Sequence, residues 1–315
     1  MYKVGDIIDG YRLLHECGTG AYGTVFRAEN DATGEIVALK VVYAMGTHYD
    51  REIKGLIKYR ERCSHRNLMA IHHVAQFENG IYYTMNLADN LSTGGDYIPD
   101  TLANRIRKHG VLSSDAIIQM GLEILEGLEV LHSHGLVHRD IKPDNILWIN
   151  GQAVLADIGL MADNGQTTLA GTPGFISPAL LNGNGKADMT DDLYALGKVL
   201  YCALTGNAVR DFPHFPETRT LTGAGRVIRA YTAACEKYSP IRTVADFRSR
   251  LQNDRVGKSR SWKTLGGYFA LLCLLLLILG KVINYMQTKS IAEPQPHLSK
   301  ELYKSYGQAA DDTAF

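Results

Sequence analysis

The chain lacks the features that mark several specialised classes of protein. Its five cysteines are widely spaced and include no C-x-x-C, which argues against a disulfide framework or zinc site and favours a reducing compartment. Lys and Arg number 33, as do Asp and Glu, so no charge excess points to nucleic acid. No apolar stretch opens the sequence, so we expect no secretory signal peptide. With 45% hydrophobic and 21% charged residues, the composition is that of a globular protein.

Long hydrophobic runs are also lacking, with one exception near the C-terminal end. Residues 264–280 carry no charge, and a helix over 264–285 would be about 33 Å long, against about 30 Å for the hydrocarbon core of a bilayer. Lys281 would extend its ammonium to the headgroups. We predict a single transmembrane helix over 264–285, through which the chain contacts the lipid bilayer; a buried core helix is the alternative.

The charges on either side of this segment predict its orientation. Six basic residues lie in the nineteen positions before it and three in the nineteen after it. Because positive charge is retained on the cytoplasmic side, we expect residues 1–255 and a basic juxtamembrane linker, 256–263, to be cytoplasmic. Residues 286–315 would then form a short extracytoplasmic tail.

The pattern of apolar residues changes within 1–255. Between residues 11 and 86, short apolar runs are separated by Gly, Asn and Asp, as in a small antiparallel sheet, and one amphipathic helical stretch interrupts them at 49–62. From about residue 112, apolar residues recur at spacings of three and four, which is typical of helices. We therefore predict an α+β fold with a β-rich N-lobe at about 1–86 and a larger α-helical C-lobe at about 87–255.

A glycine-rich segment and a lone lysine lie in the predicted sheet. Gly18, Gly20 and Gly23 form G-x-G-x-x-G, and glycine lets backbone amides approach phosphate oxygens. A dinucleotide-binding loop would open a helix, whereas the sequence that follows is strand-like; a plain glycine-rich hairpin is the alternative. Lys40 interrupts the apolar strand IVALKVV and is costly to bury without an anion, for which Glu52 is a candidate. Otherwise Lys40 would lie on an edge strand and face water.

The strongest local signal is LVHRDIKPDNILWI at 136–149, where polar residues crowd between apolar runs. Asp140 can accept a hydroxyl proton, Lys142 can neutralise a transferring phosphate and Asn145 can offer an oxygen to a cation. Asp157 ends the next apolar run and suits Mg²⁺ as a ligand, although an aspartate there could also serve as a turn or helix cap.

Taken in order, these motifs make residues 8–253 resemble the Hanks-type (eukaryotic-like) protein kinases. The resemblance implies a bilobed kinase fold that binds ATP and Mg²⁺, with Mn²⁺ as the alternative cation, between the lobes. It implies that the catalytic residues are Asp140, Lys142, Lys40 and Glu52, and that the metal ligands are Asn145 and Asp157. The nucleotide-binding positions that match are Gly18, Thr19, Gly20, Ala21, Tyr22, Gly23, Val25, Ala38, Lys40, Met85 and the hinge residues Asn86, Leu87 and Ala88. Asp192 matches the residue that anchors the catalytic loop.

The resemblance also implies the reaction. Lys142 and Thr172 are typical of kinases that phosphorylate Ser and Thr hydroxyls of proteins. We therefore expect a bacterial, membrane-anchored Ser/Thr kinase with a cytoplasmic catalytic domain, acting in membrane-linked signalling, with dimerisation and autophosphorylation. A pseudokinase scaffold that recruits partners at the membrane and a kinase acting on a small molecule are the alternatives.

Several positions depart from the family pattern or indicate regulation. Ile158 replaces the usual Phe or Leu, and Asn86 replaces the usual hinge Glu. Ala179 stands where a Glu normally pairs with a late Arg, here Arg242, so we expect Arg242 to meet water or another partner and the substrate-docking segment to be looser. Arg139 precedes the catalytic aspartate and commonly receives an activation-segment phosphate, for which the candidate sites are Thr167 and Thr168; a loop ordered without phosphate is the alternative.

Overall fold

The computed structural model describes residues 1–20, 23–43, 47–163, 165, 170–182, 186–215, 223–253 and 281, without the side chains of 47–52, 158 and 162. Met1–Asp254 form one unit and Arg255–Phe315 a second, of which only Lys281 is described. The predicted linker, membrane helix and tail therefore lie outside the described residues. None of the helices formed by the described residues is both long enough and apolar enough to cross a bilayer.

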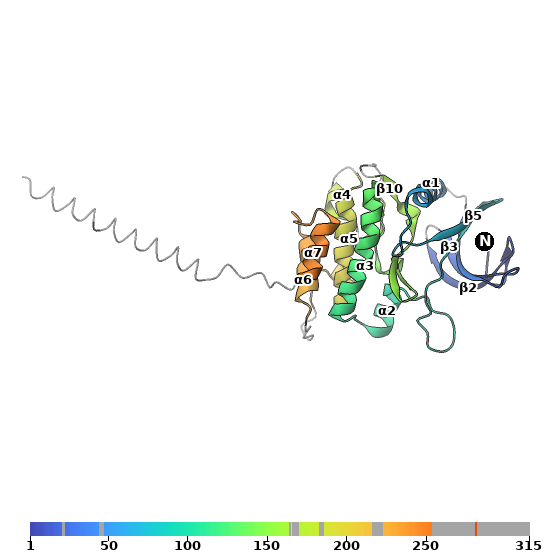
Figure 1. Cartoon of the computed structure of the whole chain (residues 1–315), viewed down its shortest axis with the longest axis horizontal. Helices are drawn as coiled ribbons and strands as arrows, with labels where there is room; N and C mark the ends of the chain where they lie inside the picture. The colour runs from blue at the N-terminus through green and yellow to red at the C-terminus, as the bar shows by residue number, and fades with distance from the viewer. Residues whose placement is uncertain are drawn as a thin grey trace, which may run out of the picture. The chain divides into compact units, whose positions relative to one another are not determined.

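The N-lobe is built on a six-stranded antiparallel sheet (Figure 1). Its strands lie in the order β1-β2-β3-β4-β6-β5. Strand β4 is buried over six of its eight residues because it lies between β3 and β6 and is apolar on both faces. The bounds are β1 Ile7–Ile8, β2 Tyr11–Gly20, β3 Gly23–Asn30, β4 Ile36–Tyr43, β5 Ile71–Phe77 and β6 Gly80–Met85, with helix α1, Thr47–Arg62, between β4 and β5.

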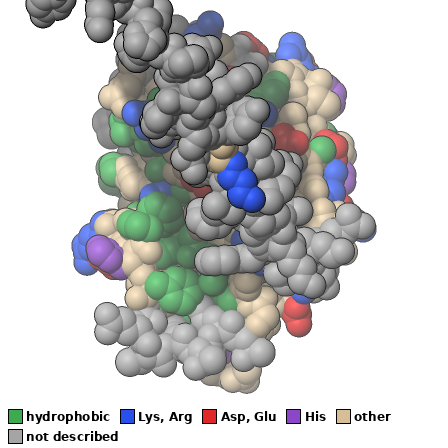
Figure 2. Space-filling model, turned by 90° about the vertical axis from the view of Figure 1, so that its left-hand side faces the viewer, with side chains coloured by type: hydrophobic (Ala, Val, Ile, Leu, Met, Phe, Trp, Pro, Cys, Tyr) green, Lys and Arg blue, Asp and Glu red, His purple; other side chains and the backbone are tan. Residues whose placement is uncertain are grey.

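The C-lobe is mainly helical. Helix α5 is buried along nearly its whole length, and its first turn is fixed by a capping box in which Asp188 and Asp191 bond each other's backbone amides. The helices are α2 Leu102–His109, α3 Ser114–Ser133, α4 Pro178–Asn182, α5 Met189–Thr205, α6 Gly225–Cys235 and α7 Val244–Gln252. Figure 2 views the side on which α6 and α7 lie and shows hydrophobic side chains grouped on this face, with basic side chains around them.

Short strands and single helical turns connect these helices to the sheet. Strands β8 and β9 form a hairpin, and β7 pairs with β10. Two backbone hydrogen bonds fasten the β8–β9 hairpin to the N-lobe. The amide of Met69 donates to the carbonyl of Leu155 at 3.0 Å, and the amide of Leu155 donates to the carbonyl of Asn67 at 2.9 Å. The remaining bounds are β7 Leu136–Val137, η1 Pro143–Asn145, β8 Ile146–Ile149, β9 Gln152–Leu155, η2 Ile158–Leu160, β10 Ala162–Asp163 and η3 Val209–Asp211.

This architecture confirms the predicted bilobed α+β fold. The larger hydrophobic core runs from the inner face of the sheet, at Ala38 and Met85, through to Leu128 and Leu196 in the C-lobe helices. A smaller core around Leu13 covers the outer face of the sheet. The polar segment at 138–145 therefore lies between β7 and β8, on the side of the C-lobe that faces the sheet.

Candidate active site

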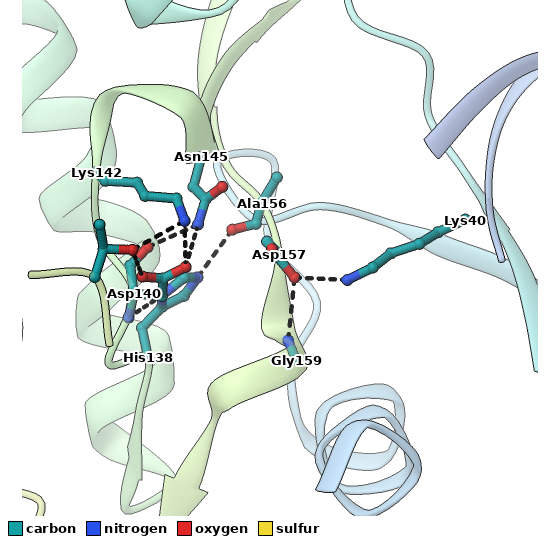
Figure 3. A network of polar contacts seen from close by, with 9 residues as sticks. Lys40, His138, Asp140, Lys142, Asn145, Ala156, Asp157 and Gly159 are labelled. Carbon is teal, nitrogen blue, oxygen red and sulfur yellow. Dashed lines mark hydrogen bonds and ion pairs between the residues drawn. The ribbon is translucent and has the colours of Figure 1, made fainter. Parts of the chain in front are cut away.

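Lys40 is held in the interior by the central strand β4. Its side chain reaches toward Asp157 (Figure 3), and the residue is 4% exposed. Its Nζ lies 2.8 Å from Asp157 Oδ1, although 117 residues separate the two along the chain (Figure 3). The Nζ also lies 5.8 Å from the ring centroid of Tyr83, on the neighbouring strand β6. The alternative of a lysine facing water is therefore wrong, and Lys40 meets an anion as its burial requires.

The surroundings of Asp157 favour its charged form. Burial raises the pKa of its carboxyl, but Lys40 above all, and also His138, favour the charged form and hold the pKa below its usual value. The backbone amide of Gly159 lies 3.4 Å from the Asp157 Oδ1. Asp157 itself adopts a φ of +64°, a backbone conformation that is uncommon for residues other than glycine. Because 26% of the side chain is exposed, the carboxylate remains accessible to a cation.

Asp140 lies in the catalytic loop, residues 138–145, and is 2% exposed. Its carboxylate accepts hydrogen bonds from Thr172 Oγ1 at 2.6 Å and from Lys142 Nζ at 2.8 Å. Asn145 Nδ2 donates to the Asp140 carboxylate at 3.1 Å and to its backbone carbonyl at 2.8 Å. These donors fix the orientation of the carboxylate, and Lys142 supplies a positive charge beside it.

A buried aspartate in the first turn of α5 holds the catalytic loop through hydrogen bonds to its backbone. Asp192 is fully buried and accepts the backbone amides of His138 and Arg139, each at 2.9 Å. Burial raises the pKa of Asp192, but the hydrogen bond and charge of His132, 2.9 Å away, outweigh it and hold the pKa below its usual value. The expected anchoring role of Asp192 is therefore matched by its contacts, which compensate for the strained φ of +72° at Arg139.

The described residues fit a nucleoside triphosphate and its metal ion. The amide group of Asn145 donates to Asp140, and its oxygen points away from that residue (Figure 3), as a cation ligand requires. At Gly23, where φ is +126°, a Cβ atom would lie 2.1 Å from the carbonyl oxygen of Val41, so only glycine fits this end of the glycine-rich hairpin. Lys40 adds a cation opposite these groups.

The positions expected around the adenine line up on adjacent strands. Ala38 on β4 and Met85 on β6 are paired in register, and Val25, on β3, lies one strand further along. Asn86 directs its side chain to His72, whose Nε2 lies 2.6 Å from the Asn86 Oδ1. Thr19, at the tip of β2, bonds Glu16 at 2.7 Å.

The segment around Ala179 is held by contacts that the sequence analysis missed. Ala179 and Arg242 are both exposed, so Arg242 meets water as expected. The hydroxyl of Ser177 instead donates to Asp191, and it accepts the amide of Leu180 at 2.9 Å. The signal that could have found this tether is a serine directly before a helix that begins with proline, together with a pair of aspartates at the start of the long C-lobe helix.

Some predicted site residues lie outside the described residues. These are Ala21, Tyr22, Thr167 and Thr168, and the side chains of Glu52 and Ile158.

Comparison with known proteins agrees with this geometry. The family model described as protein kinase domain matches residues 11–238. The chain is 29% identical over 221 residues to the probable serine/threonine-protein kinase PknB of Lactococcus lactis. This match covers 65% of the chain and 33% of the relative. The chain is also 31% identical over 211 residues to the calcium/calmodulin-dependent protein kinase type 1B of Rattus norvegicus, covering 64% of this chain and 58% of the relative.

These curated relatives are longer proteins, and the match spans only one third to somewhat over one half of their length. The matched residues nevertheless include the glycine-rich hairpin, Lys40, the catalytic loop and Asp157, whose contacts are described above. The expected resemblance is confirmed, and the chain belongs to the protein kinase family, in its Hanks-type Ser/Thr branch.

Proposed function

We propose that this protein is an ATP-dependent Ser/Thr protein kinase. The observation that carries the proposal is the contact between Lys40 and Asp157, 2.8 Å apart, beside an Asp140 whose carboxylate is held by Thr172 and Lys142. A lysine, a metal-binding carboxylate and a proton-accepting carboxylate are the groups that phosphoryl transfer needs in one place.

Members of the family use ATP and Mg²⁺, which supply the γ-phosphoryl group and neutralise charge on the phosphates. Asp157 and Asn145 are the residues that would hold the metal ion. Lys40 orients the phosphates from the N-lobe side. Asp140 accepts the proton of the acceptor hydroxyl, and Lys142, 2.8 Å from Asp140, adds positive charge at the acceptor side.

Thr172 supports an acceptor of the Ser/Thr type. Its hydroxyl bonds both Asp140, at 2.6 Å, and Lys142, at 3.0 Å. The threonine thereby ties the segment on which a protein substrate would dock to the two residues that act on its hydroxyl. Short acceptor side chains suit a site in which docking segment and catalytic carboxylate are this close.

The proposal extends to the cell membrane. The uncharged stretch 264–280 and the basic residues before it support a single-pass anchor over 264–285, with residues 1–255 in the cytoplasm and a role in membrane-linked signalling. Arg139 before the catalytic aspartate supports autophosphorylation at Thr167 or Thr168, for which dimerisation would bring two chains together.

The test uses the full chain in detergent with labelled ATP, Mg²⁺ and a basic protein substrate. We expect label on the substrate and on the chain, abolished by Asp140→Ala and by Lys40→Met. Lys3→Met, which alters an exposed lysine, is the matched control and should keep full activity.

Three outcomes would overturn parts of the proposal. Binding of ATP without any transfer by the wild-type chain would favour the pseudokinase scaffold, and transfer only to a small molecule would favour the other alternative. Complete release of the chain from membranes at alkaline pH would contradict the anchor.

A further inference from the structure

The segment that joins the hinge to α2 is a folded loop, drawn in teal below β2 in Figure 1. Its two sides meet at a bridge between Asn90 and Pro99, and the amide of Leu91 donates to the carbonyl of Ile98 at 2.9 Å. The side chain of Asn90 accepts the amides of Ser92 and Ile98, each at 3.0 Å. These bonds give the loop a defined shape.

The base of this loop is fastened to the C-lobe. The carboxylate of Asp89 accepts the amides of Asn150 at 2.9 Å and Gly151 at 2.8 Å, at the turn between β8 and β9. At the other side of the base, Asp100 bonds Arg105 through both carboxylate oxygens, at 2.6 and 2.7 Å. The loop therefore moves with the C-lobe.

One side chain of the loop reaches the N-lobe. The ring of Tyr97 lies edge-on to the ring of His15 on β2, with centroids 5.8 Å apart at 85°. The guanidinium carbon of Arg27, on β3, lies 5.6 Å from the Tyr97 centroid. His15 and Arg27 are themselves partners in the β2–β3 ladder. His15 lies three residues before Gly18, where the glycine-rich segment begins.

The same side chain also touches the hinge. The hydroxyl of Tyr97 donates to the carbonyl oxygen of Ala88 at 2.9 Å. Burial raises the pKa of the Tyr97 phenol, so the group stays protonated and remains a donor. Ala88 is buried and is one of the three hinge residues that the family resemblance places beside adenine.

We propose that Tyr97 is a positioning residue for the nucleotide, a strut that sets the distance between the glycine-rich hairpin and the hinge. It connects the strand that carries the phosphate-binding glycines to a loop anchored on the C-lobe, and it orients the Ala88 peptide. With the strut in place, the cleft is preorganised for ATP and resists the opening that releases ADP. The inference rests on the proposed use of ATP.

The test compares Tyr97→Ala and Tyr97→Phe in the full chain, with Ile98→Ala as the matched control. Ile98 is the next residue of the same loop, and its side chain is exposed. We expect Tyr97→Ala to raise the KM for ATP, and the dissociation rate of a fluorescent ADP, by about tenfold, with kcat unchanged or higher. Tyr97→Phe keeps the ring and loses only the hydroxyl, so the change should be about threefold. Ile98→Ala should match the wild type.

A second measurement separates positioning from folding. Combining Tyr97→Ala with His15→Ala should change ADP dissociation no more than Tyr97→Ala does by itself, because both remove the same contact. The KM for the protein substrate should stay constant in every variant. Unchanged ADP dissociation in Tyr97→Ala would overturn the inference. A fall in kcat together with a fall in melting temperature would also overturn it, because it would indicate a general loss of folding.

Binding of fluorescent ADP requires no phosphoryl transfer. A wild-type chain that binds ADP without transferring phosphate would contradict the proposed kinase activity and leave the strut to be judged on ADP release. Normal transfer with normal ADP release in Tyr97→Ala would contradict the strut alone.

Discussion

At the scale of single residues, the site depends on how Asp140 is held. A carboxylate takes a proton from a hydroxyl that lies within hydrogen-bond reach of one of its oxygens, and here Thr172 and Lys142 each donate to one of those oxygens. Neither donor belongs to the helices that build the lobe, so each can be changed with little effect on packing.

Replacing Thr172 by Val should lower kcat by about tenfold to a hundredfold, because the variant keeps the shape of the side chain and loses its hydrogen bond to Asp140. The KM for ATP should change little. Thr172→Ser restores the hydroxyl and should recover most of the rate in the same steady-state assay. A Val variant with full kcat would show that Thr172 does not orient the carboxylate.

Asp192 makes stability depend on pH. Its pKa is lower in the folded protein than in the unfolded chain, where it is about 3.9. The unfolded state therefore takes up the proton first as the pH falls, and the stabilisation by Asp192 is present above about pH 4 and lost as the pH falls through the folded-state value. Denaturant unfolding of Asp192→Asn between pH 6 and 3 should show a weaker pH dependence than wild type. Parallel curves would contradict this.

At the scale of elements, two segments are fixed by close contacts with a neighbouring strand or helix. The glycine-rich hairpin closes against β4 at Gly23, and the docking segment joins α5 through Ser177. Each depends on one small residue for its fit, so each offers a comparison with a nearby position that lacks the constraint.

Gly23→Ala should destabilise the N-lobe by about 1–3 kcal/mol, because the new Cβ would collide with the Val41 carbonyl and the backbone has positive φ. Gly18→Ala is the matched control, since nothing lies within 4 Å of a Cβ built there. Thermal unfolding should distinguish the two. Equal melting temperatures would contradict the close approach of β3 to β4.

Ser177→Ala should raise the KM for the protein substrate severalfold, because the docking segment loses its bond to Asp191. The KM for ATP should stay unchanged. Ser133→Ala, at the exposed end of α3, is a control for a serine whose hydroxyl bonds only locally. A rise in both KM values would indicate a general loss of folding.

At the scale of the whole molecule, the described structure is concentrated in one unit. Met1–Asp254 share a continuous core that joins both lobes, and the hydrophobic run at 264–280 belongs to the second unit. The candidate active-site residues and the proposed membrane segment therefore belong to different units of the chain.

A chain ending at Asp254 should unfold at the same temperature as the full chain and retain ATP binding, because its core is complete. It should also appear in the supernatant after membranes are sedimented, since it lacks 264–285. Calorimetry measures the unfolding temperature, and fractionation separately measures membrane attachment. A truncated chain that still sediments with membranes would place the attachment within residues 1–254.

The sequence by itself determined the chemistry of the site and the succession of its parts. Glycine at Gly23 and the acids at Asp140 and Asp157 could be assigned because each need is local: a close approach of the backbone, or a carboxylate that follows an apolar run. The periodicity of apolar residues likewise predicted the change from sheet to helix near residue 112.

Only the tertiary structure decided which distant groups meet. The contact of Tyr97 with Ala88 and His15 depends on the path of a folded loop, and the bond between Ser177 and Asp191 depends on how α4 docks on α5. The Tyr97 contacts have no periodic or motif signal, because they are set by packing rather than by neighbouring residues. For Ser177 the sequence shows a serine before a helix that begins with proline, but it does not show which aspartate the serine meets. For the same reason, the sequence left open whether Lys40 faces water or an anion, and the 2.8 Å contact with Asp157 decided it.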